Sequence, residues 1–400
     1  MKRPTAARRP ADNSPDAGRS SPQISASKAQ RDKSESAPAS LRSMYLIEIT
    51  SQLQRAGFPA YRGKQVYHWI FKQGIRALDE MSNIPKDVRA FLAEKFRLGG
   101  VEMEKCQEAP SDGTKKMLFR LNDGRFIESV LMFDKGRNSL CVSTQVGCPL
   151  ACSFCMTGLA GFQRNLGADE IVDQVLFAKR TFLPDRPLNN IIFMGMGEPL
   201  LNFDNTIRAL RLLLDPQGVG MSSRRITVST AGLIPGIDAL GESDVDVNLA
   251  ISLTATTDEL RDRLIPLNRK YPIGDLIAAA RRYPLTNRRR ITFEYTLLKD
   301  FNDSDADARR LGKLLHGIRS KINLIQFNSG PGLPYELSAP QRVEAFRKVL
   351  TDKHLTVSLR YSKGSEIAAA CGQLAGPLSQ DRRNSPGKLK GIDTEPPNGF

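Results

Sequence analysis

The sequence predicts an α/β protein whose core is a partial or complete (β/α) barrel. From residue 139 onward, short β-rich runs alternate with amphipathic helical stretches such as residues 170–182. A parallel sheet is the usual outcome of this alternation. Glycine-rich and polar segments follow several of these runs, where a (β/α) barrel carries its active site. The candidate strands are residues 139–144, 190–195, 225–230, 247–252, 291–298, 322–327 and 356–361.

The rest of the chain divides by composition around this core. Residues 1–42 have almost no large apolar side chains and are basic, and residues 376–400 are rich in Pro, Gly and charge, so both predict disordered tails. Apolar side chains recur at three- and four-residue spacing in residues 43–100, which indicates a small helical domain. Residues 101–138 carry two apolar runs around Asn122-Asp123-Gly124 and predict a β-hairpin linker to the barrel, residues 139–375.

Charge and cysteine usage restrict the class of protein. The formal net charge of +15 favours a polyanionic partner, which could be RNA, DNA or an acidic membrane surface. No run of about 18 apolar residues predicts a membrane span, and the N-terminus lacks the apolar region of a secretory signal. Three of the six cysteines crowd into eight residues, which does not suit a disulfide framework. We therefore expect a protein of the reducing cytoplasm.

The segment GCPLACSFC brings three cysteines together, Cys148, Cys152 and Cys155. Three thiolates can bind three irons of a [4Fe–4S] cluster and leave the fourth iron without a protein ligand. S-adenosylmethionine can chelate that open iron, and one electron then breaks its C–S bond to give a 5′-deoxyadenosyl radical. A structural zinc would need a fourth ligand, and the nearest histidines, His68 and His316, are remote in sequence. The segment predicts radical S-adenosylmethionine chemistry, with a zinc loop as the alternative.

Polar residues after the next strand runs fit contacts to that cofactor. In GMGEP, glycine allows close approach of the backbone at Gly197, and Glu198 can accept from the cofactor's ammonium. Ser229 and Ser252 end two later runs, where ribose or carboxylate contacts would fall. An ordinary βα turn is the alternative for the glycine segment, and serine at a strand end is common.

Taken together, these segments resemble the radical adenine-C2 methyltransferases of ribosomal and transfer RNA, the RlmN family. The resemblance covers about residues 45–376 and leaves out the two tails. The joint order and spacing of its markers are much more specific than the cysteine segment alone. The markers are LCVSTQVGCPLACSFCMTG, FMGMGEPLLN, TVSTAG, NLAISL, QFN and AACGQLAG.

The resemblance implies a role for individual residues. Cys371 would carry the methyl group, Cys141 would be its redox partner, and Glu128 would be the base. Thr254 stands where many members have His, although its hydroxyl can still donate a hydrogen bond. The cluster ligands would be Cys148, Cys152 and Cys155. The contacts to S-adenosylmethionine would be Gly197, Glu198, Ser229, Ser252, Leu253, Thr254 and Asn328.

The chemistry of adenine carbon 2 accounts for a second pair of thiols. This carbon is electron-poor, so a radical route needs a nucleophile that holds a methyl group, and a thiolate is well suited. Addition of the S–CH2 radical of Cys371 to the ring leaves a thioether between protein and RNA. Release needs removal of the carbon-2 proton, for Glu128, and a thiol that takes the sulfur as a disulfide, for Cys141. By itself, Cys371 is equally compatible with an inert buried thiol.

Strand alternation predicts the surroundings of Glu128. In a strand over residues 126–133, Glu128 shares a face with Phe126, Val130 and Met132. A carboxylate on an apolar face should have a raised pKa, as a base working at neutral pH needs. An ion pair at a strand edge is the alternative. Cys106 has no matching role, and we interpret it as structural.

Basic clusters with interleaved aromatic residues favour RNA as the partner. Each cluster alone could be a solvated face, and Trp69 alone is more typical of a core. A target adenine must leave its stack to reach the radical. The candidates are Arg224, Arg225, Arg281, Arg282 and Arg288–Arg290 in the barrel, and Arg62, Lys64 and Lys72 with Tyr61, Tyr67 and Trp69 in the helical domain.

The sequence thus predicts an S-adenosylmethionine-dependent rRNA/tRNA (adenine-C2)-methyltransferase. The resemblance implies 23S ribosomal RNA and some transfer RNAs as substrates, and a one-electron donor such as flavodoxin or ferredoxin. We expect a cytoplasmic monomer with no membrane partner. The alternatives are an adenine carbon-8 methyltransferase, a radical enzyme with another substrate, and a zinc-stabilised RNA-binding protein.

Overall fold

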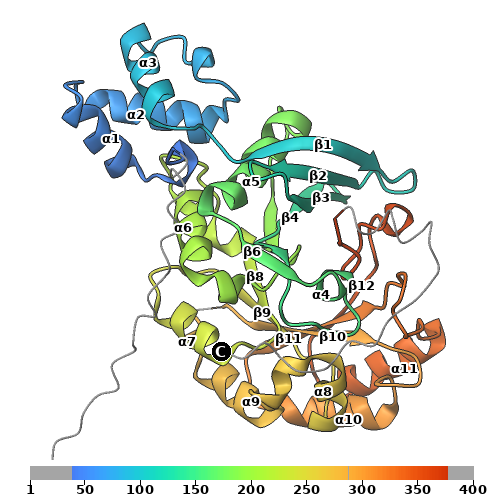
Figure 1. The fold of residues 1–400 in the computed structure, drawn as a ribbon. Helices are drawn as coiled ribbons and strands as arrows, with labels where there is room; N and C mark the ends of the chain where they lie inside the picture. Colours follow the sequence, from blue (N-terminus) through green and yellow to red (C-terminus); the bar gives the residue numbers. More distant parts are fainter. Residues whose placement is uncertain (1–37, 287, 377–400) are drawn as a thin grey trace, which may run out of the picture. The chain divides into compact units, whose positions relative to one another are not determined.

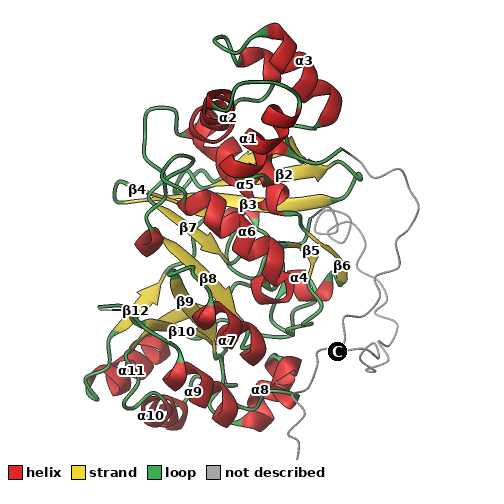
Figure 2. Ribbon diagram, turned by 90° about the vertical axis from the view of Figure 1, so that its left-hand side faces the viewer, coloured by secondary structure: helices red, strands yellow, loops and turns green. Residues whose placement is uncertain are grey.

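The computed structural model describes residues 38–286 and 288–376. Ten strands of this part form one sheet in the order β1-β2-β3-β4-β7-β8-β9-β10-β11-β12 (Figures 1 and 2). Neighbouring strands from β4 to β12 are parallel, and those from β1 to β4 are antiparallel. Among the described residues β1 and β12 are the two edges and do not pair, so the predicted barrel is partial.

The parallel strands correspond to the seven predicted runs, with ends that differ by a few residues. The first run is the most altered, since β4 ends at Cys141 and residues 142–144 leave the strand. The bounds are β4 Arg137–Cys141, β7 Asn190–Phe193, β8 Ile226–Thr230, β9 Asn248–Ser252, β10 Ile291–Leu297, β11 Ser320–Gln326 and β12 Val357–Arg360. A separate antiparallel pair is β5 Gln145–Gly147 with β6 Phe162–Asn165.

Amphipathic helices connect the parallel strands and bury one face each against them. In both ribbon views α8, α9, α10 and α11 lie side by side beyond β10 and β11 (Figures 1 and 2). In the part of the chain that is described, no helix is long and apolar enough to cross a membrane. The bounds are α4 Met156–Leu159, α5 Ala168–Phe182, α6 Phe203–Leu214, α7 Ile234–Glu242, α8 Asp258–Leu264, α9 Ile273–Arg282, α10 Asp305–Leu314 and α11 Pro340–Thr351.

The predicted hairpin is present but extends the barrel sheet. β2 (Lys115–Leu121) and β3 (Phe126–Asp134) pair antiparallel, and β3 pairs in turn with β4. A further strand, β1 (Val101–Glu108), adds to β2 at the edge. The segment predicted as a linker is therefore part of the same sheet, because the apolar side chains of β2 and β3 continue the barrel core.

The N-terminal helical region shares this core. Its helices are α1 (Leu46–Arg55), α2 (Tyr61–Tyr67) and α3 (Lys86–Lys95), and a π-helical turn extends α2. The C-terminal boundary predicted for the disordered tail, residue 42, lies too far along the chain. Leu41 is buried in the core, and Arg42 is buried as well. The remainder of that tail, residues 1–37, and residues 377–400 of the C-terminal tail lie outside the described residues.

A buried ion pair joins the first residues of this region to the barrel. Arg42 Nη1 lies 2.6 Å from Asp173 Oδ1 in α5. The other oxygen of Asp173 accepts the backbone N–H of Gly100 at 2.6 Å. Arg42 also donates to the carbonyl of Ile75 at 2.5 Å. One carboxylate thus fixes both ends of the helical region against α5.

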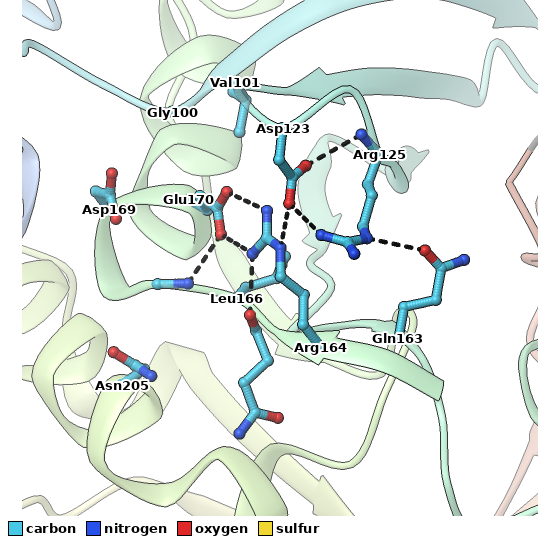
Figure 3. Close-up of polar contacts among 12 residues, drawn as sticks. Gly100, Val101, Asp123, Arg125, Gln163, Arg164, Leu166, Asp169, Glu170 and Asn205 are labelled. Carbon is cyan, nitrogen blue, oxygen red and sulfur yellow. Dashed lines mark hydrogen bonds and ion pairs between the residues drawn. The ribbon is translucent and has the colours of Figure 1, made fainter. Parts of the chain in front are cut away.

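A second polar network fixes the strands beside the cysteine segment (Figure 3). Arg164 in β6 donates to Asp123 at 2.6 Å, in the turn between β2 and β3, and to both oxygens of Glu170 at 2.7 and 2.8 Å, at the start of α5. Partial burial opposes ionisation of Asp123, but hydrogen bonds from Arg164 and Arg125 lower its pKa to about 2. One guanidinium therefore ties together a hairpin turn, β6 and the N-terminus of α5.

Replacement of Asp173 by Ala should lower the free energy of unfolding by about 3–5 kcal/mol, because it leaves the buried guanidinium of Arg42 without its counter-charge. Urea denaturation measures the change. Asp244→Ala is the matched control, since Asp244 pairs with Arg211 at the surface and such pairs contribute about 1 kcal/mol or less. Similar losses in the two variants would contradict this role for Asp173.

Candidate active site

A cavity opens at the carboxyl ends of the parallel strands, as the barrel prediction requires. It brings together residues from eight separate parts of the chain, including the cysteine segment and the loop around Cys371. Of the predicted site residues, those that line it are Cys148, Cys152, Cys155, Gly197, Glu198, Ser229, Ser252, Asn328 and Cys371. Those that are absent from its lining are Glu128, Cys141, Leu253 and Thr254.

Backbone hydrogen bonds hold the cysteine segment in place at both ends. Cys148 donates its N–H to the carbonyl of Gly161 at 3.1 Å, beside the β5–β6 pair. Ser153 donates to the carbonyl of Leu264 at the end of α8, at 3.0 Å. Within the segment, Cys155 donates to Cys152 at 3.1 Å. The thiols therefore project into the cavity from a loop with fixed ends.

The donor set, three cysteines that line one cavity, fits an iron–sulfur cluster. Within residues 38–286 and 288–376, no group of three or more His, Cys, Asp or Glu side chains converges on a single-ion site. All three thiols nevertheless line one cavity. Burial raises the pKa of Cys148 to about 12, so it needs a nearby positive charge to become a thiolate. Several irons spread over a cluster provide that charge to three separate sulfurs.

The GMGEP segment fixes a buried carboxylate at the cavity wall. Gly197 has φ +101°, and a Cβ there would lie 2.5 Å from Gln145, so only glycine fits. Glu198 accepts the backbone N–H of Leu200 at 3.1 Å and that of Ala231 at 2.8 Å. Burial raises the pKa of Glu198 to about 7 despite these bonds. A carboxylate held in this way can accept from an ammonium group in the cavity.

Thr254 and Leu253 lie beside the cavity but do not face it. Both are at most 1% exposed, and Thr254 has a left-handed backbone with φ 57°. The carbonyl of Thr254 accepts from Asn302 at 2.6 Å. The two predicted cofactor contacts at these positions are therefore not brought into the cavity, because the chain turns inward directly after Ser252.

Arg261 shapes the cavity wall and was missed by the sequence analysis. Its guanidinium is fully buried and donates to the carbonyl of Ala231 at 2.6 Å and to that of Ser252 at 3.1 Å. It thereby joins the loops that follow β8 and β9. Burial lowers its pKa to about 10. An arginine in the charged helix α8 looks like a surface residue, so no sequence pattern marked it.

Cys371 lies in a loop that covers the cysteine segment. Its carbonyl accepts from Asn328 Nδ2 at 3.1 Å, and the next carbonyl, of Gly372, accepts from Met156 at 2.7 Å. Cys371 is exposed and lines the cavity, while desolvation by the surrounding protein, and then the charge of Glu294, raise the pKa of its thiol to about 11. Cys141 is buried at the end of β4, and burial, with a smaller contribution from nearby Cys371, raises its pKa. Both thiols are free, as are the other four cysteines.

Glu128 is buried, but its surroundings are not apolar as we predicted. Its carboxylate is 3.2 Å from Lys116 Nζ and accepts the backbone N–H groups of Ala375 and Gly376. The alternative of an ion pair is the one found, although the pair is inside the protein. Strand alternation gave the correct face but not the charged residue on the neighbouring strand. Cys106, which we interpreted as structural, is exposed on β1.

Comparison with known proteins identifies the family. Residues 142–311 match the model of the radical SAM superfamily, and residues 40–98 match that of the ribosomal RNA large subunit methyltransferase N-terminal domain. The dual-specificity RNA methyltransferase RlmN of Geobacter sulfurreducens is 48% identical over 87% of this chain and 95% of its own length. The corresponding protein of Pelobacter propionicus is 46% identical over 86% and 97%.

The chain belongs to the RlmN family. A crystal structure of a radical SAM methyltransferase from Sphaerobacter thermophilus matches with a TM-score of 0.81 and 45% identity, over 84% of this chain and 99% of that one. The protein is thus a radical SAM methyltransferase that acts on RNA, with a [4Fe–4S] cluster and S-adenosylmethionine as cofactors.

The basic clusters that we proposed as RNA contacts in this RlmN-family barrel lie away from the cavity. Arg224 and Arg225 precede β8, and the second cluster precedes β10, so both lie toward the amino ends of the parallel strands. The second cluster comprises Arg281, Arg282 and Arg288–Arg290. Arg289 is buried and pairs with Asp246. In the helical region Tyr67 is buried and donates to Asp215. Trp69 is half-buried against the core, whereas Tyr61 is exposed.

The raised pKa of Cys371 predicts how its alkylation depends on pH. Only the thiolate reacts, so below its pKa of about 11 the rate of iodoacetamide alkylation in cluster-free protein should rise about tenfold per pH unit. The rise should continue to pH 10, measured by mass spectrometry of the peptide that contains Cys371. A small-molecule thiol of ordinary pKa is the control. A plateau of the Cys371 rate near pH 9 would contradict the expectation.

Proposed function

We propose that this protein methylates carbon 2 of a specific adenine in 23S ribosomal RNA, and in some transfer RNAs, with Cys371 as methyl carrier. The observation that carries the proposal is the placement of Cys371 in the same cavity as the three thiols of the cysteine segment. A second thiol, Cys141, and a buried carboxylate, Glu128, lie outside the cavity but next to the segment that bears Cys371. The chain and its relatives named RlmN match over most of their lengths, which supports this substrate class.

Cys148, Cys152 and Cys155 are the residues that would hold the cluster. When bound, it supplies one electron that cleaves S-adenosylmethionine to a 5′-deoxyadenosyl radical. Gly197, Glu198, Ser229, Ser252 and Asn328 would hold the S-adenosylmethionine. Leu253 and Thr254 would act from behind the cavity wall, because their side chains are buried.

The remaining residues handle the methyl group. Cys371 takes it by displacement from one S-adenosylmethionine and presents it in the cavity, where hydrogen abstraction gives an S–CH2 radical that adds to the adenine. Glu128 then accepts the carbon-2 proton. Cys141 forms a disulfide with Cys371 and so breaks the bond between sulfur and the methylene carbon. The freed carbon takes up a proton to become the methyl group, and the unpaired electron of the adduct leaves to a one-electron acceptor. Two further electrons must reduce this disulfide before the next turnover.

Methylation at carbon 8 of adenine is the nearest alternative, since it would use the same cavity. Enzymatic digestion of modified RNA followed by chromatography separates the two methyladenines. A zinc-stabilised RNA-binding protein would need no second pair of thiols. For the cellular setting, we propose a cytoplasmic monomer that receives electrons from a donor such as flavodoxin or ferredoxin.

The cluster assignment predicts about four irons and four sulfides per chain after anaerobic reconstitution, because three thiolates suit one cubane. Cys152→Ala should abolish iron binding while circular dichroism stays unchanged. Cys106→Ala, at an exposed thiol on β1, is the matched control and should keep full iron content. Active protein with stoichiometric zinc and no iron would exclude the cluster.

The roles proposed for Cys141 and Cys371, the two thiols outside the cysteine segment, predict opposite results in a cross-linking assay. Cys141→Ala should still consume S-adenosylmethionine but stop at the thioether, so that protein migrates covalently bound to RNA on a denaturing gel. Cys371→Ala should form no cross-link, since it has no methyl group to activate. Cys106→Ala should behave as the unchanged protein. Normal turnover of Cys141→Ala under reducing conditions would remove both role assignments.

A further inference from the structure

Lys116 in β2 is a buried lysine for which the sequence analysis found no role. Its side chain is 7% exposed, and its Nζ lies 3.2 Å from Oε1 of Glu128, whose side chain is 4% exposed. The strand register places Leu118 opposite Glu128. Lys116 is therefore the diagonal neighbour of Glu128 on the same face of the sheet, within reach of a long side chain.

This ion pair contacts the Cys371 loop on both sides of the thiol. Before Cys371, Lys116 Nζ donates to the carbonyl of Ala368 at 3.3 Å. After it, Glu128 Oε2 accepts the backbone N–H groups of Ala375 and Gly376 at 2.9 and 3.0 Å. The Lys116–Glu128 pair, which includes the proposed base, thus contacts the chain both before and after the proposed methyl carrier.

The charge of Lys116 has a direct effect on Glu128. A buried carboxylate is stable in its ionised form only when nearby charges and hydrogen-bond donors replace the lost water. Here Lys116 supplies the charge and two backbone amides supply donors. Removal of this cation would leave the buried carboxylate of the proposed base without its counter-charge and would disturb its position.

We propose that Lys116 is a positioning residue for methyl transfer, which supplies the counter-charge of the Glu128 carboxylate and joins it to residues 368–376. The inference rests on the proposed role of Glu128 as the base. When the carbon-2 C–H bond breaks, the proton moves to a Glu128 oxygen and the electron pair stays on the adduct. Glu128 is then neutral, so its bonds to Lys116 and to the two amides weaken. The loop is released at the stage where Cys371 must meet Cys141.

Lys116→Met, which keeps the length of the side chain but not its charge, tests this. Cluster content and methylation of Cys371, measured by mass spectrometry, should stay within about twofold of the unchanged protein. Formation of methyladenine should fall by about 100-fold, the scale of general-base catalysis, and the protein–RNA cross-link should accumulate. Lys115→Met is the matched control and should turn over normally, because Lys115 pairs with Glu108 and not with Glu128.

Two further measurements separate this role from a merely structural one. If Lys116 acts through Glu128, the double variant Lys116→Met with Glu128→Gln should be no slower than Glu128→Gln alone. Hydrogen exchange in residues 368–376 should be faster in Lys116→Met than in Lys115→Met. Lys116→Gln is a second neutral variant and should show the same block if Lys116→Met does not retain its cluster.

The inference fails if Lys116→Met makes methyladenine at the normal rate, or if it loses Cys371 methylation in proportion to product. The unchanged protein, assayed in parallel, keeps this failure distinct from failure of the proposed function. Absence of methyladenine from the unchanged protein would overturn the proposed function itself.

Discussion

The open side of the parallel sheet is the constraint on which the site depends. β12 and β1 do not pair in the described part of the chain, so the segment after β12 must cross to the other end of the sheet. It does so by polar contacts, since Gly364 donates its N–H to Asp112 at 3.1 Å and Lys363 lies 3.5 Å from Asp134. The Cys371 loop is the continuation of this crossing. A barrel with a closed sheet would leave no such path for it.

The crossing segment is held largely by its backbone. The carbonyls of Gly372 and Leu374 accept from Met156 and Thr157, which directly follow the cysteine segment. Gly372 has φ +80°, a conformation that suits glycine. Backbone contacts specify where the loop lies and leave the Cys371 side chain free for chemistry. Side chains of Lys116, Glu128 and Asn328 also contact the segment.

The parallel strands and the cysteine segment could be predicted from sequence because their patterns are local. Buried parallel strands appear as continuous apolar runs, and three cysteines in one loop need no knowledge of distant residues. The pairing of Lys116 with Glu128 could not be predicted in the same way. It depends on the register of β2 against β3, which the Asn122–Gly124 turn sets but which apolar alternation alone does not reveal.

Other differences between the predictions and the structure also arise because contacts between distant residues cannot be deduced from local sequence patterns. Arg261 was missed because its helix is charged, and only the fold shows that its side chain enters the barrel. Leu253 and Thr254 were assigned from the resemblance to the family, yet the side chains of both are buried behind the cavity wall. The arginines of the second basic cluster were proposed as RNA contacts, but they lie toward the amino ends of the strands, away from the cavity. In each case the sequence predicts the helix, strand or turn in which a residue lies, but not the direction in which its side chain points.

The outermost strand has a consequence for behaviour in solution. No strand among the described residues pairs with the outer edge of β1. Such edges can recruit strands from other molecules. Its exposed positions are mostly charged, including Glu102, Glu104 and Lys105, and its pairing with β2 is interrupted between Met103 and Lys105. Charge and irregularity both disfavour growth of the sheet by another chain. The strand that completes the hairpin region therefore also protects the protein against aggregation.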